Sequence, residues 1–225
     1  MSADVVVSGV ATRLGVDSRA LRAVLLVECG SDDPARWLSA SGRPTIRVEA
    51  RHVLRAWTGA PGVSGLRVRD QHAGYWYGGR TPEPSRTHDA SGRLVDDEEV
   101  CIDGGWSAYH GRQERDDQGR PGEWDALDCE DSLVGLDIAT RCASWGPGQV
   151  LGDWRALGYS SVAELRSSAA TPDGGLDLVA RYLEAHRAAL VALAAHDWAG
   201  FARAYNGPGQ VDYYAGKLAA AFVHT

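Results

Sequence analysis

The residue with the clearest potential for chemistry is Glu28, an acid inside the apolar segment RAVLLVECGS, residues 22–31. At helical spacing, three apolar residues fall on the same face as this acid: Leu21, Val24 and Leu25. Burial on that face and the negative end of the helix dipole both raise a glutamate pKa above about 4.3. A carboxyl group that stays protonated can protonate a leaving-group oxygen, as glycoside cleavage requires. The competing interpretation is a helix-terminal glutamate that points into water.

Two later segments carry side chains suited to binding a sugar: Ser144, Trp145 and Gln149 in ASWGPGQV, and Tyr205 and Asn206 in ARAYNGPG. The first segment is a glycine-rich break after a predicted helix, where backbone amides and an aromatic ring are available. The second puts a tyrosine and an asparagine at a helix end before a Gly-Pro turn. Taken singly, each segment is equally well explained by a turn or by core packing.

Together and in this order, the motifs resemble those of goose-type lysozymes and soluble lytic transglycosylases. The chain is most similar to one branch of this lysozyme-like superfamily, the N-acetylmuramidase domain of phage endolysins. The similar segments are LGVDSRALRAVLLVECG, IRVEARH, ASWGPGQVLG, DWAGFARAYNGPG and YYAGKLAAAF, within roughly residues 8–58 and 123–222. The resemblance implies that Glu28 is the catalytic acid and that Gln149, Tyr205 and Asn206 contact substrate. Ser144 and Trp145 then shape the groove.

The cysteines depart from the family pattern. Cys29 stands where a serine usually follows the catalytic glutamate, and Cys142 occupies a small polar position. By the resemblance, a Cys29–Cys142 disulfide beside the active site is one arrangement, which leaves Cys101 and Cys129 for a second bond. Free thiols are the alternative, and four cysteines alone allow three pairings that the sequence does not distinguish.

Hydrolysis also needs a second carboxylate. An inverting enzyme holds its base about 6.5–9.5 Å from the acid, and a retaining enzyme holds its nucleophile at about 5 Å. Glu49 follows the predicted strand TIRV, and the endolysin branch has a glutamate at this strand-to-helix position. The alternative is that Glu49 caps or salt-bridges the helix that follows. Asp32 and Asp33 are rivals, although they equally suit the start of the turn in DPAR.

Several classes of function are disfavoured. A net charge of −7 argues against a nucleic acid or an anionic membrane as partner. No apolar stretch is long enough to span a bilayer, and MSADVVVSGVATRLGV does not have the pattern of a signal peptide. The histidines of the first half match no ligand spacing, so we predict no metal and no other cofactor; they are His52, His72, His88 and His110.

The elements that must position these residues are mainly helical. We expect helices over residues 5–14 and 17–29, closed by Gly15 and Gly30, and a small β-hairpin within 31–48. Another helix is expected to begin near Glu49. The second half reads as helices, including one long helix from about Gly175 to Ala195. The fold class is therefore lysozyme-like α+β, mainly α, with the hairpin beside the catalytic helix.

Between these parts lies a loop-rich insertion at about 59–120, rich in Gly, Pro, Asp and Arg. We expect one short helix in it, near Trp106. Its aromatic residues either extend a glycan platform or anchor the loop to the core; they are Tyr75, Trp76, Tyr77, Trp106 and Tyr109.

The sequence as a whole predicts one domain over residues 1–225, a monomer that binds bacterial peptidoglycan. We expect a muramidase that cleaves the β-1,4 bond between N-acetylmuramic acid and N-acetylglucosamine, with Glu28 as general acid. The alternatives are a lytic transglycosylase that forms 1,6-anhydro-muramyl ends, and a non-catalytic glycan-binding or phage structural module. The missing export signal fits a phage or prophage lysin released by a partner pore, a tail-associated lysin, or an excised domain of a longer protein. The stereochemical course and the target species stay open.

Overall fold

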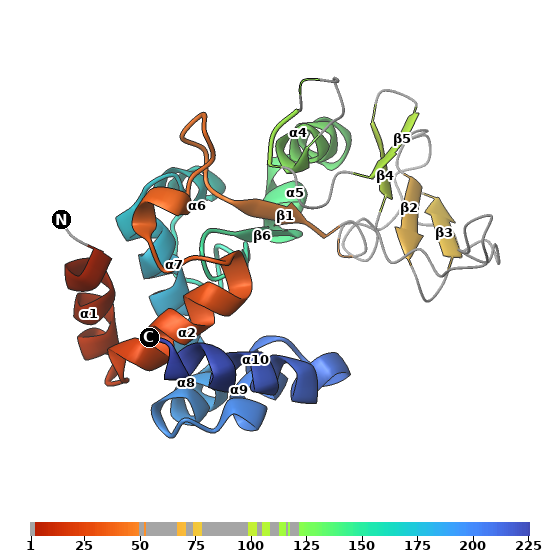
Figure 1. Ribbon diagram of the computed structural model, residues 1–225. Coiled ribbons are helices and arrows are strands. Elements are labelled where there is room, and N and C mark those ends of the chain that lie inside the picture. Colours follow the sequence, from red (N-terminus) through yellow and green to blue (C-terminus); the bar gives the residue numbers. More distant parts are fainter. Residues whose placement is uncertain are drawn as a thin grey trace. The chain divides into compact units, whose positions relative to one another are not determined.

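The computed structural model of the chain describes residues 3–49, 52, 67–70, 74–77, 99–102, 105–108, 113–115, 117 and 122–225 (Figure 1). The chain forms two compact units. The helical unit comprises Met1–Thr45, Trp145–Val150 and Trp154–Thr225, and the middle unit comprises Ile46–Ser144 and Leu151–Asp153. Within the described ranges, no helix has both the length and the apolar character needed to cross a membrane.

The helical unit begins with two helices that the sequence predicted, although the first begins two residues earlier than expected. Helix α1 spans Ala3–Leu14, and α2 spans Ser18–Cys29. The side chain of Asp17 accepts a hydrogen bond from the backbone of Arg19 and so caps α2. Gly30 ends α2 with φ 75°, a left-handed conformation that glycine adopts without strain. These caps fix where the helix stops, and therefore where Glu28 lies on its last turn.

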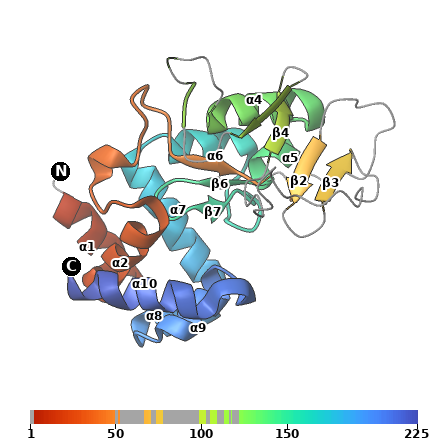
Figure 2. The same cartoon turned by 45° about the vertical axis from the view of Figure 1, so that its right-hand side comes forward.

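The remaining helices of this unit are α6 (Val162–Ala169), α7 (Pro172–Ala185), α8 (Arg187–Ala194), α9 (Trp198–Tyr205) and α10 (Val211–Val223). The prediction of one long helix over 175–195 is wrong, because the chain turns between α7 and α8 (Figure 2). His186 makes the break with φ −107° and ψ 73°. Its Nδ1 lies 2.9 Å from the carbonyl oxygen of Tyr182, a local interaction that stabilises the bend.

The core of the helical unit forms around α2, which packs against α10 and α8 (Figure 1). The buried side chains of α2 are Ala20, Leu21, Ala23, Val24 and Leu25. Phe201 of α9 and Leu218 of α10 are also almost fully buried. Each large apolar side chain removed from water contributes about 1.5–3 kcal/mol. The apolar face predicted around Glu28 is therefore a true core face.

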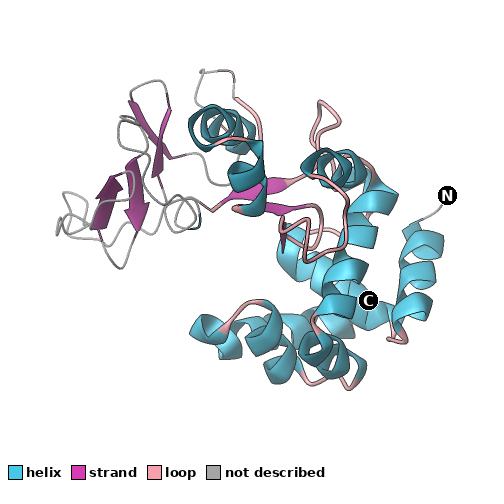
Figure 3. Cartoon of the chain, turned by 180° about the vertical axis from the view of Figure 1, so that it is seen from behind, coloured by secondary structure: helices cyan, strands magenta, loops and turns pink. Residues whose placement is uncertain are grey.

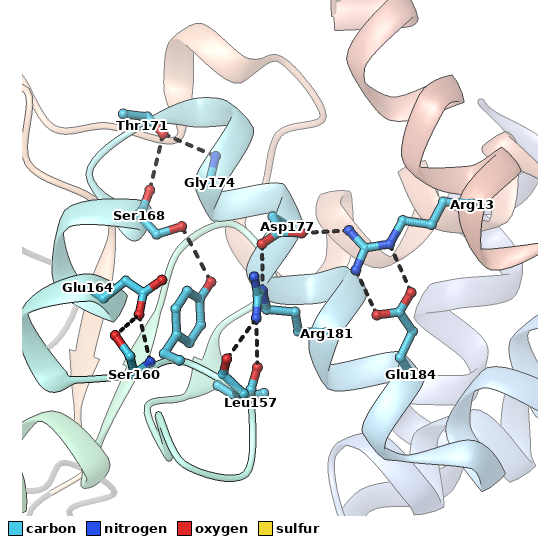
Figure 4. Close-up of polar contacts among 12 residues, drawn as sticks. Arg13, Leu157, Ser160, Glu164, Ser168, Thr171, Gly174, Asp177, Arg181 and Glu184 are labelled. Carbon is cyan, nitrogen blue, oxygen red and sulfur yellow. Dashed lines mark hydrogen bonds and ion pairs between the residues drawn. The ribbon is translucent and has the colours of Figure 1, made fainter.

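A polar network joins α1 to α7 on the surface of the same unit (Figure 4). Arg13 donates hydrogen bonds to Asp177 (2.6 Å) and to Glu184 (2.8 Å and 2.7 Å). Arg181 donates to the other oxygen of Asp177 at 2.6 Å and to the carbonyl oxygens of Leu157 and Gly158 at 3.2 Å. The network ties the loop before α6 and the end of α1 to α7.

A three-stranded sheet, in the order β1-β6-β7, contains the strands Ile46–Val48, Ala143–Trp145 and Val150–Leu151. The segment before β1 folds back at an isolated bridge between Leu38 and Pro44. The predicted hairpin is thus a short turn, while β1 pairs with β6, almost a hundred residues away. The segment ASWGPGQV, which the sequence indicated as a glycine-rich break, contributes to the two remaining strands. Helices α4 (Glu123–Val134) and α5 (Leu136–Arg141) belong to the middle unit.

The middle unit also contains a four-stranded sheet in the order β3-β2-β4-β5 (Figure 3). Its strands are β2 (Arg67–Asp70), β3 (Gly74–Tyr77), β4 (Glu99–Ile102) and β5 (Gly105–Ala108). Neighbouring strands are antiparallel, with Val68 opposite Val100 and Cys101 opposite Trp106. The prediction of a short helix near Trp106 is therefore wrong. The expected helix after Glu49 lies outside the described residues, apart from His52, and so does Tyr109.

Candidate active site

Glu28 lies on the last turn of α2 and is half-buried. The side-chain amide of Asn206 donates a hydrogen bond to Glu28 Oε1 at 2.9 Å, across 178 positions of sequence. Asn206 is itself placed as the C-cap of α9, where its backbone N–H bonds to the carbonyl oxygen of Ala202 at 2.9 Å. Two helix ends, one early and one late in the chain, thus meet through an amide and a carboxyl group.

Tyr205, the residue before Asn206, holds the glycine-rich turn in place. Its hydroxyl donates a hydrogen bond to the carbonyl oxygen of Gly148 at 2.7 Å. A Cβ atom on Gly148 would lie 2.8 Å from the Tyr205 hydroxyl and would collide with Val179. The Tyr205 ring also meets the ring of Tyr182 edge-on, with centroids 4.9 Å apart. Glycine at 148 therefore allows the turn to approach α7 and Tyr205 closely.

The turn itself is stabilised from within. The carbonyl oxygen of Gly146 accepts hydrogen bonds from both the backbone N–H and the side-chain amide of Gln149, each at 3.0 Å. Gln149 has φ 49°, which is uncommon for a residue with a side chain. Its amide stabilises the turn, and the predicted substrate contact of this residue stays a prediction.

Trp145, the last residue of β6, has no exposed surface. The guanidinium group of Arg166 lies 5.4 Å from the centroid of its ring. A ring that is fully covered has no face on which a sugar can stack. Trp145 can therefore shape the turn that follows it, and the idea that it stacks on a sugar is wrong.

The negative charge of Glu28 acts on several neighbours. Burial, and then this charge, raise the pKa of Tyr205 well above its ordinary value. The same two causes raise the pKa of Tyr182. Burial raises the pKa of the Cys29 thiol to about 11, and Glu28 adds to that effect. Glu28 thus lies close to the hydroxyl groups of two tyrosines and to a thiol, in surroundings that are partly aromatic.

Tyr182 is the residue of this group that the sequence reasoning missed as a functional candidate. It reads as part of the apolar stripe of α7, and its ring does pack there. Its ring also stacks on that of His186 at 3.9 Å, one helical turn later. A hydroxyl group within an apolar stripe, followed by a histidine four positions on, was the available signal.

The structure does not contain the Cys29–Cys142 disulfide, because both cysteines are free thiols. The Cys29 sulfur donates to the carbonyl oxygens of Leu25 at 3.2 Å and Ser31 at 3.1 Å, as a hydroxyl group at this position can do. Cys142 is buried, which raises its pKa to about 12. The side chains of Cys101 and Cys129 lie outside the described residues.

The two aspartates after Glu28 have structural partners. Asp32 Oδ2 lies 2.8 Å from Arg22 Nη1 in an ion pair. Asp33 accepts a hydrogen bond from the backbone of Ala35 at 3.0 Å and caps the short 3₁₀ helix Pro34–Arg36. The turn-forming interpretation is confirmed for Asp33.

Glu49 lies in the middle unit, directly after β1, with 8% of its surface exposed. Its backbone N–H bonds to the carbonyl oxygen of Cys142 at 3.0 Å, and its own carbonyl oxygen accepts from the N–H of His52 at 2.7 Å. Its carboxylate forms an ion pair with Arg47, at 3.7 Å between Oε1 and Nε. Ser144, in the same unit, is also buried, with 7% exposed.

The loop aromatics, expected either to extend a glycan platform or to anchor the loop to the core, fall on two strands of the four-stranded sheet where they lie within the described residues. Tyr75, Trp76 and Tyr77 belong to β3, and Trp106 belongs to β5. The structure describes their backbone alone, so their suggested role stays a prediction.

Comparison with known proteins gives two matches and one negative result. The sequence profile described as "Muramidase: N-acetylmuramidase" matches residues 17–225. Among solved structures, the chain is similar to the crystal structure of the endolysin of the Burkholderia phage AP3, with a TM-score of 0.63 and 25% sequence identity. That match covers 98% of this chain and 69% of the endolysin. No curated protein matches the sequence significantly.

Proposed function

The chain belongs to the N-acetylmuramidase family of peptidoglycan-degrading glycoside hydrolases, and from this premise we propose that Glu28 is its general acid. The bond cleaved is the β-1,4 linkage from N-acetylmuramic acid to N-acetylglucosamine. Glu28 gives its proton to the linking oxygen, which leaves with the N-acetylglucosamine. Water then adds to the muramyl anomeric carbon and loses a proton to a base.

The observation that carries this proposal is the contact between Asn206 and Glu28. The amide donates to one carboxyl oxygen at 2.9 Å and thereby fixes the orientation of the group. An amide carries no net charge, so this partner binds the carboxyl group without forming an ion pair. An acid that must lose and regain a proton in each catalytic cycle is well served by such a partner.

The surroundings of Glu28 support the same role. Tyr182, Tyr205 and Cys29 are uncharged near neutral pH, and burial raises the pKa of each of them. The hydroxyl of Tyr205 is engaged with Gly148, so the tyrosine positions the turn beside Asn206. We infer that the substrate passes over Asn206 and this turn, in reach of Gln149.

For the second carboxylate we propose Glu49. Its support is its position, since it follows β1 directly and corresponds to the glutamate of the endolysin branch that the sequence resembles. It is also buried and held by backbone hydrogen bonds on both sides of its Cα. In this role it orients the attacking water or stabilises the positive charge that develops on the sugar ring. The same resemblance implies that Ser144, also in the middle unit, helps to shape the groove.

The test of the general acid is Glu28→Gln, which keeps the shape of the side chain and removes its proton. We expect the variant to fold normally and to lose activity by about 10²–10⁴-fold in the clearing of a suspension of bacterial cell walls. Asp32→Asn is the matched control, because it removes a nearby carboxylate that is already paired with Arg22. Near-normal clearing by Glu28→Gln would refute the assignment.

Mass spectrometry of the released muropeptides tests the reaction itself. Reducing N-acetylmuramic acid ends are expected from hydrolysis. Ends of the 1,6-anhydro type would instead show a lytic transglycosylase, and binding without any cleavage would show a glycan-binding module. We also propose a monomer, which light scattering at the elution peak of a size-exclusion column can check.

A further inference from the structure

One surface of α10 combines an exposed aromatic ring with an ammonium group. Tyr213 is 55% exposed and lies in the first turn of α10. Lys217, the single lysine of the sequence, follows four positions later and therefore lies on the same helical face. Its Nζ atom is 4.6 Å from the centroid of the Tyr213 ring, a cation–π distance. We refer to these two residues as the Tyr213–Lys217 pair.

The packing of the helical unit places this pair near Glu28. Helices α2 and α10 run antiparallel: Arg19, at the start of α2, donates to the carbonyl oxygen of Phe222 at 3.0 Å, near the end of α10 (Figure 1). At the other end, Asn206 reaches Glu28 and precedes the first residue of α10 by five positions. The first turns of α10 therefore lie beside the last turn of α2.

The electrostatics agree with this geometry. A hydrogen bond to Tyr213 is the main cause that raises the pKa of Lys217, and the negative charge of Glu28 contributes as well. The ammonium group thus lies within electrostatic range of the proposed general acid. Because the chain as a whole carries −7, a polyanionic ligand is repelled at long range. A local cation is needed to hold an acidic group near Glu28.

The pair presents two complementary groups to a ligand. An exposed tyrosine ring packs on the apolar face of a sugar, and an ammonium group attracts a carboxylate as a point charge. Muramyl residues carry a carboxylate, either on the free lactyl group or on the peptide attached to it, whereas N-acetylglucosamine is neutral.

We propose that Tyr213 and Lys217 form a subsite beside Glu28 that binds a carboxylate of the muramyl residue or of its peptide. This subsite makes the enzyme select muramyl glycans over neutral N-acetylglucosamine polymers. The inference rests on the proposed function and specifies which feature of that substrate is recognised.

The test measures binding by calorimetry in a full-length Glu28→Gln background, where no ligand is cleaved. Three tetrasaccharides serve as probes: neutral chitotetraose, a glycan of alternating N-acetylglucosamine and N-acetylmuramic acid with free lactyl groups, and the same glycan with its peptides. Adding Lys217→Gln is expected to raise the Kd of the acidic probes by about two- to fivefold and to leave chitotetraose unchanged. A change for one acidic probe alone identifies the lactyl group or the peptide as the source of the carboxylate.

Two further variants separate charge from packing. Lys217→Arg keeps the charge and is expected to restore most of the affinity for the acidic probes. Tyr213→Leu removes the ring and is expected to weaken all three probes by about two- to tenfold. Arg187→Gln, which removes an exposed cation from the first turn of α8, is the control and is expected to change none of them.

The outcomes are distinct. Unchanged binding of both acidic probes in Lys217→Gln overturns the subsite, as does an equal loss for chitotetraose. Either result leaves the proposed hydrolase intact, because the parent protein still binds the glycan. A parent that binds none of the three probes overturns the proposed function, and the subsite with it. Thermal denaturation of each variant confirms that binding is compared between folded proteins.

Discussion

Glu28 and Glu49 are both acids at the end of a regular element, yet the structure surrounds them differently. Glu28 ends α2 in the helical unit and is held by the neutral amide of Asn206. Glu49 follows β1 in the middle unit, is more completely buried, and pairs with the cation of Arg47.

The partners also differ in their distance along the chain. The partner of Glu28 lies 178 positions away, whereas Arg47 is two positions from Glu49. Glu28 therefore depends on the packing of α2, α9 and α10, and Glu49 depends on its own strand and on the backbone of Cys142. A local ion pair is common in any fold, whereas an amide brought from the far end of the chain is a feature that the tertiary structure builds. Glu28 is therefore the stronger candidate for a catalytic role, and the role of Glu49 needs the more direct test.

Glu49→Gln provides that test and is expected to have the largest effect among the changes that leave Glu28 in place. If Glu49 supplies the second carboxylate, the rate of cell-wall clearing falls by about 10²-fold or more. If the carboxylate of Glu49 serves only the ion pair with Arg47, clearing stays near the wild-type rate. Of the two acids, Glu28 alone would then take part in catalysis.

The control is Arg47→Gln, which breaks the same ion pair and keeps the carboxylate. Its side chain is 51% exposed, so its removal is expected to change stability by less than about 1 kcal/mol and clearing only slightly. Equal losses in both variants would assign Glu49 a structural role.

Asn206→Ala tests the hydrogen bond that holds Glu28. A hydrogen bond to a charged partner is worth about 1.5–3 kcal/mol, so we expect kcat/KM to fall by about 10- to 100-fold. In the wild type, the hydrogen bond from Asn206 favours the ionised form of the carboxyl group. Its loss favours the protonated form, so the alkaline limb of the pH–rate profile moves to higher pH. A rate loss without any shift of this limb would mean that Asn206 contacts substrate and does not position Glu28.

The sequence predicted features that depend on local chemistry. Asp17 and Gly30 identify both ends of α2, because a side-chain cap and a left-handed glycine act within one helical turn. The position of Glu28 follows from those ends. The family resemblance added Tyr205 and Asn206, which the structure places beside the turn and the acid.

The features that were missed depend on distant partners. The segment at 143–145 becomes a strand because β1 pairs with it, and its sequence does not show that partner. The break at His186 has neither proline nor glycine; it depends on its contact with Tyr182. Trp145 looked available for stacking because the local sequence does not show that the tertiary structure buries its ring. The four strands of the insertion were hidden by a composition rich in turn-forming residues.

Gly148→Ala tests whether the turn must lie against Tyr205. The added methyl group would collide with Val179 and the Tyr205 hydroxyl, so we expect a loss of about 1–2 kcal/mol in the free energy of unfolding. Gly209→Ala is the matched control, because a Cβ atom there meets nothing within 4 Å. Chemical denaturation measures both. Equal stability of the two variants would show that the turn yields without cost.

The smallest expected effect lies away from both acids, in the network that holds α7. Burial alone would raise the pKa of Asp177. Hydrogen bonds from Arg181 and Arg13 outweigh burial and lower this pKa below its ordinary value. A carboxylate with a lowered pKa stabilises the fold above about pH 3.8 and loses that contribution as the pH falls through its folded value. Asp177→Asn is therefore expected to be less stable than the wild type by about 1 kcal/mol at pH 7. The difference should shrink when the pH is lowered from 7 to a value below 3.8.

Urea denaturation at the two pH values checks this, with Asp173→Asn, an exposed acid on the first turn of the same helix, as control. Because Asp177 stabilises α7 and does not touch Glu28 or Asn206, clearing per folded molecule should stay at the wild-type rate. A difference of the same size at both pH values would contradict the charge-based account. A lower rate in a fully folded Asp177→Asn protein would show instead that α7, through Tyr182 and the turn at Gly148, transmits the position of this network to the acid.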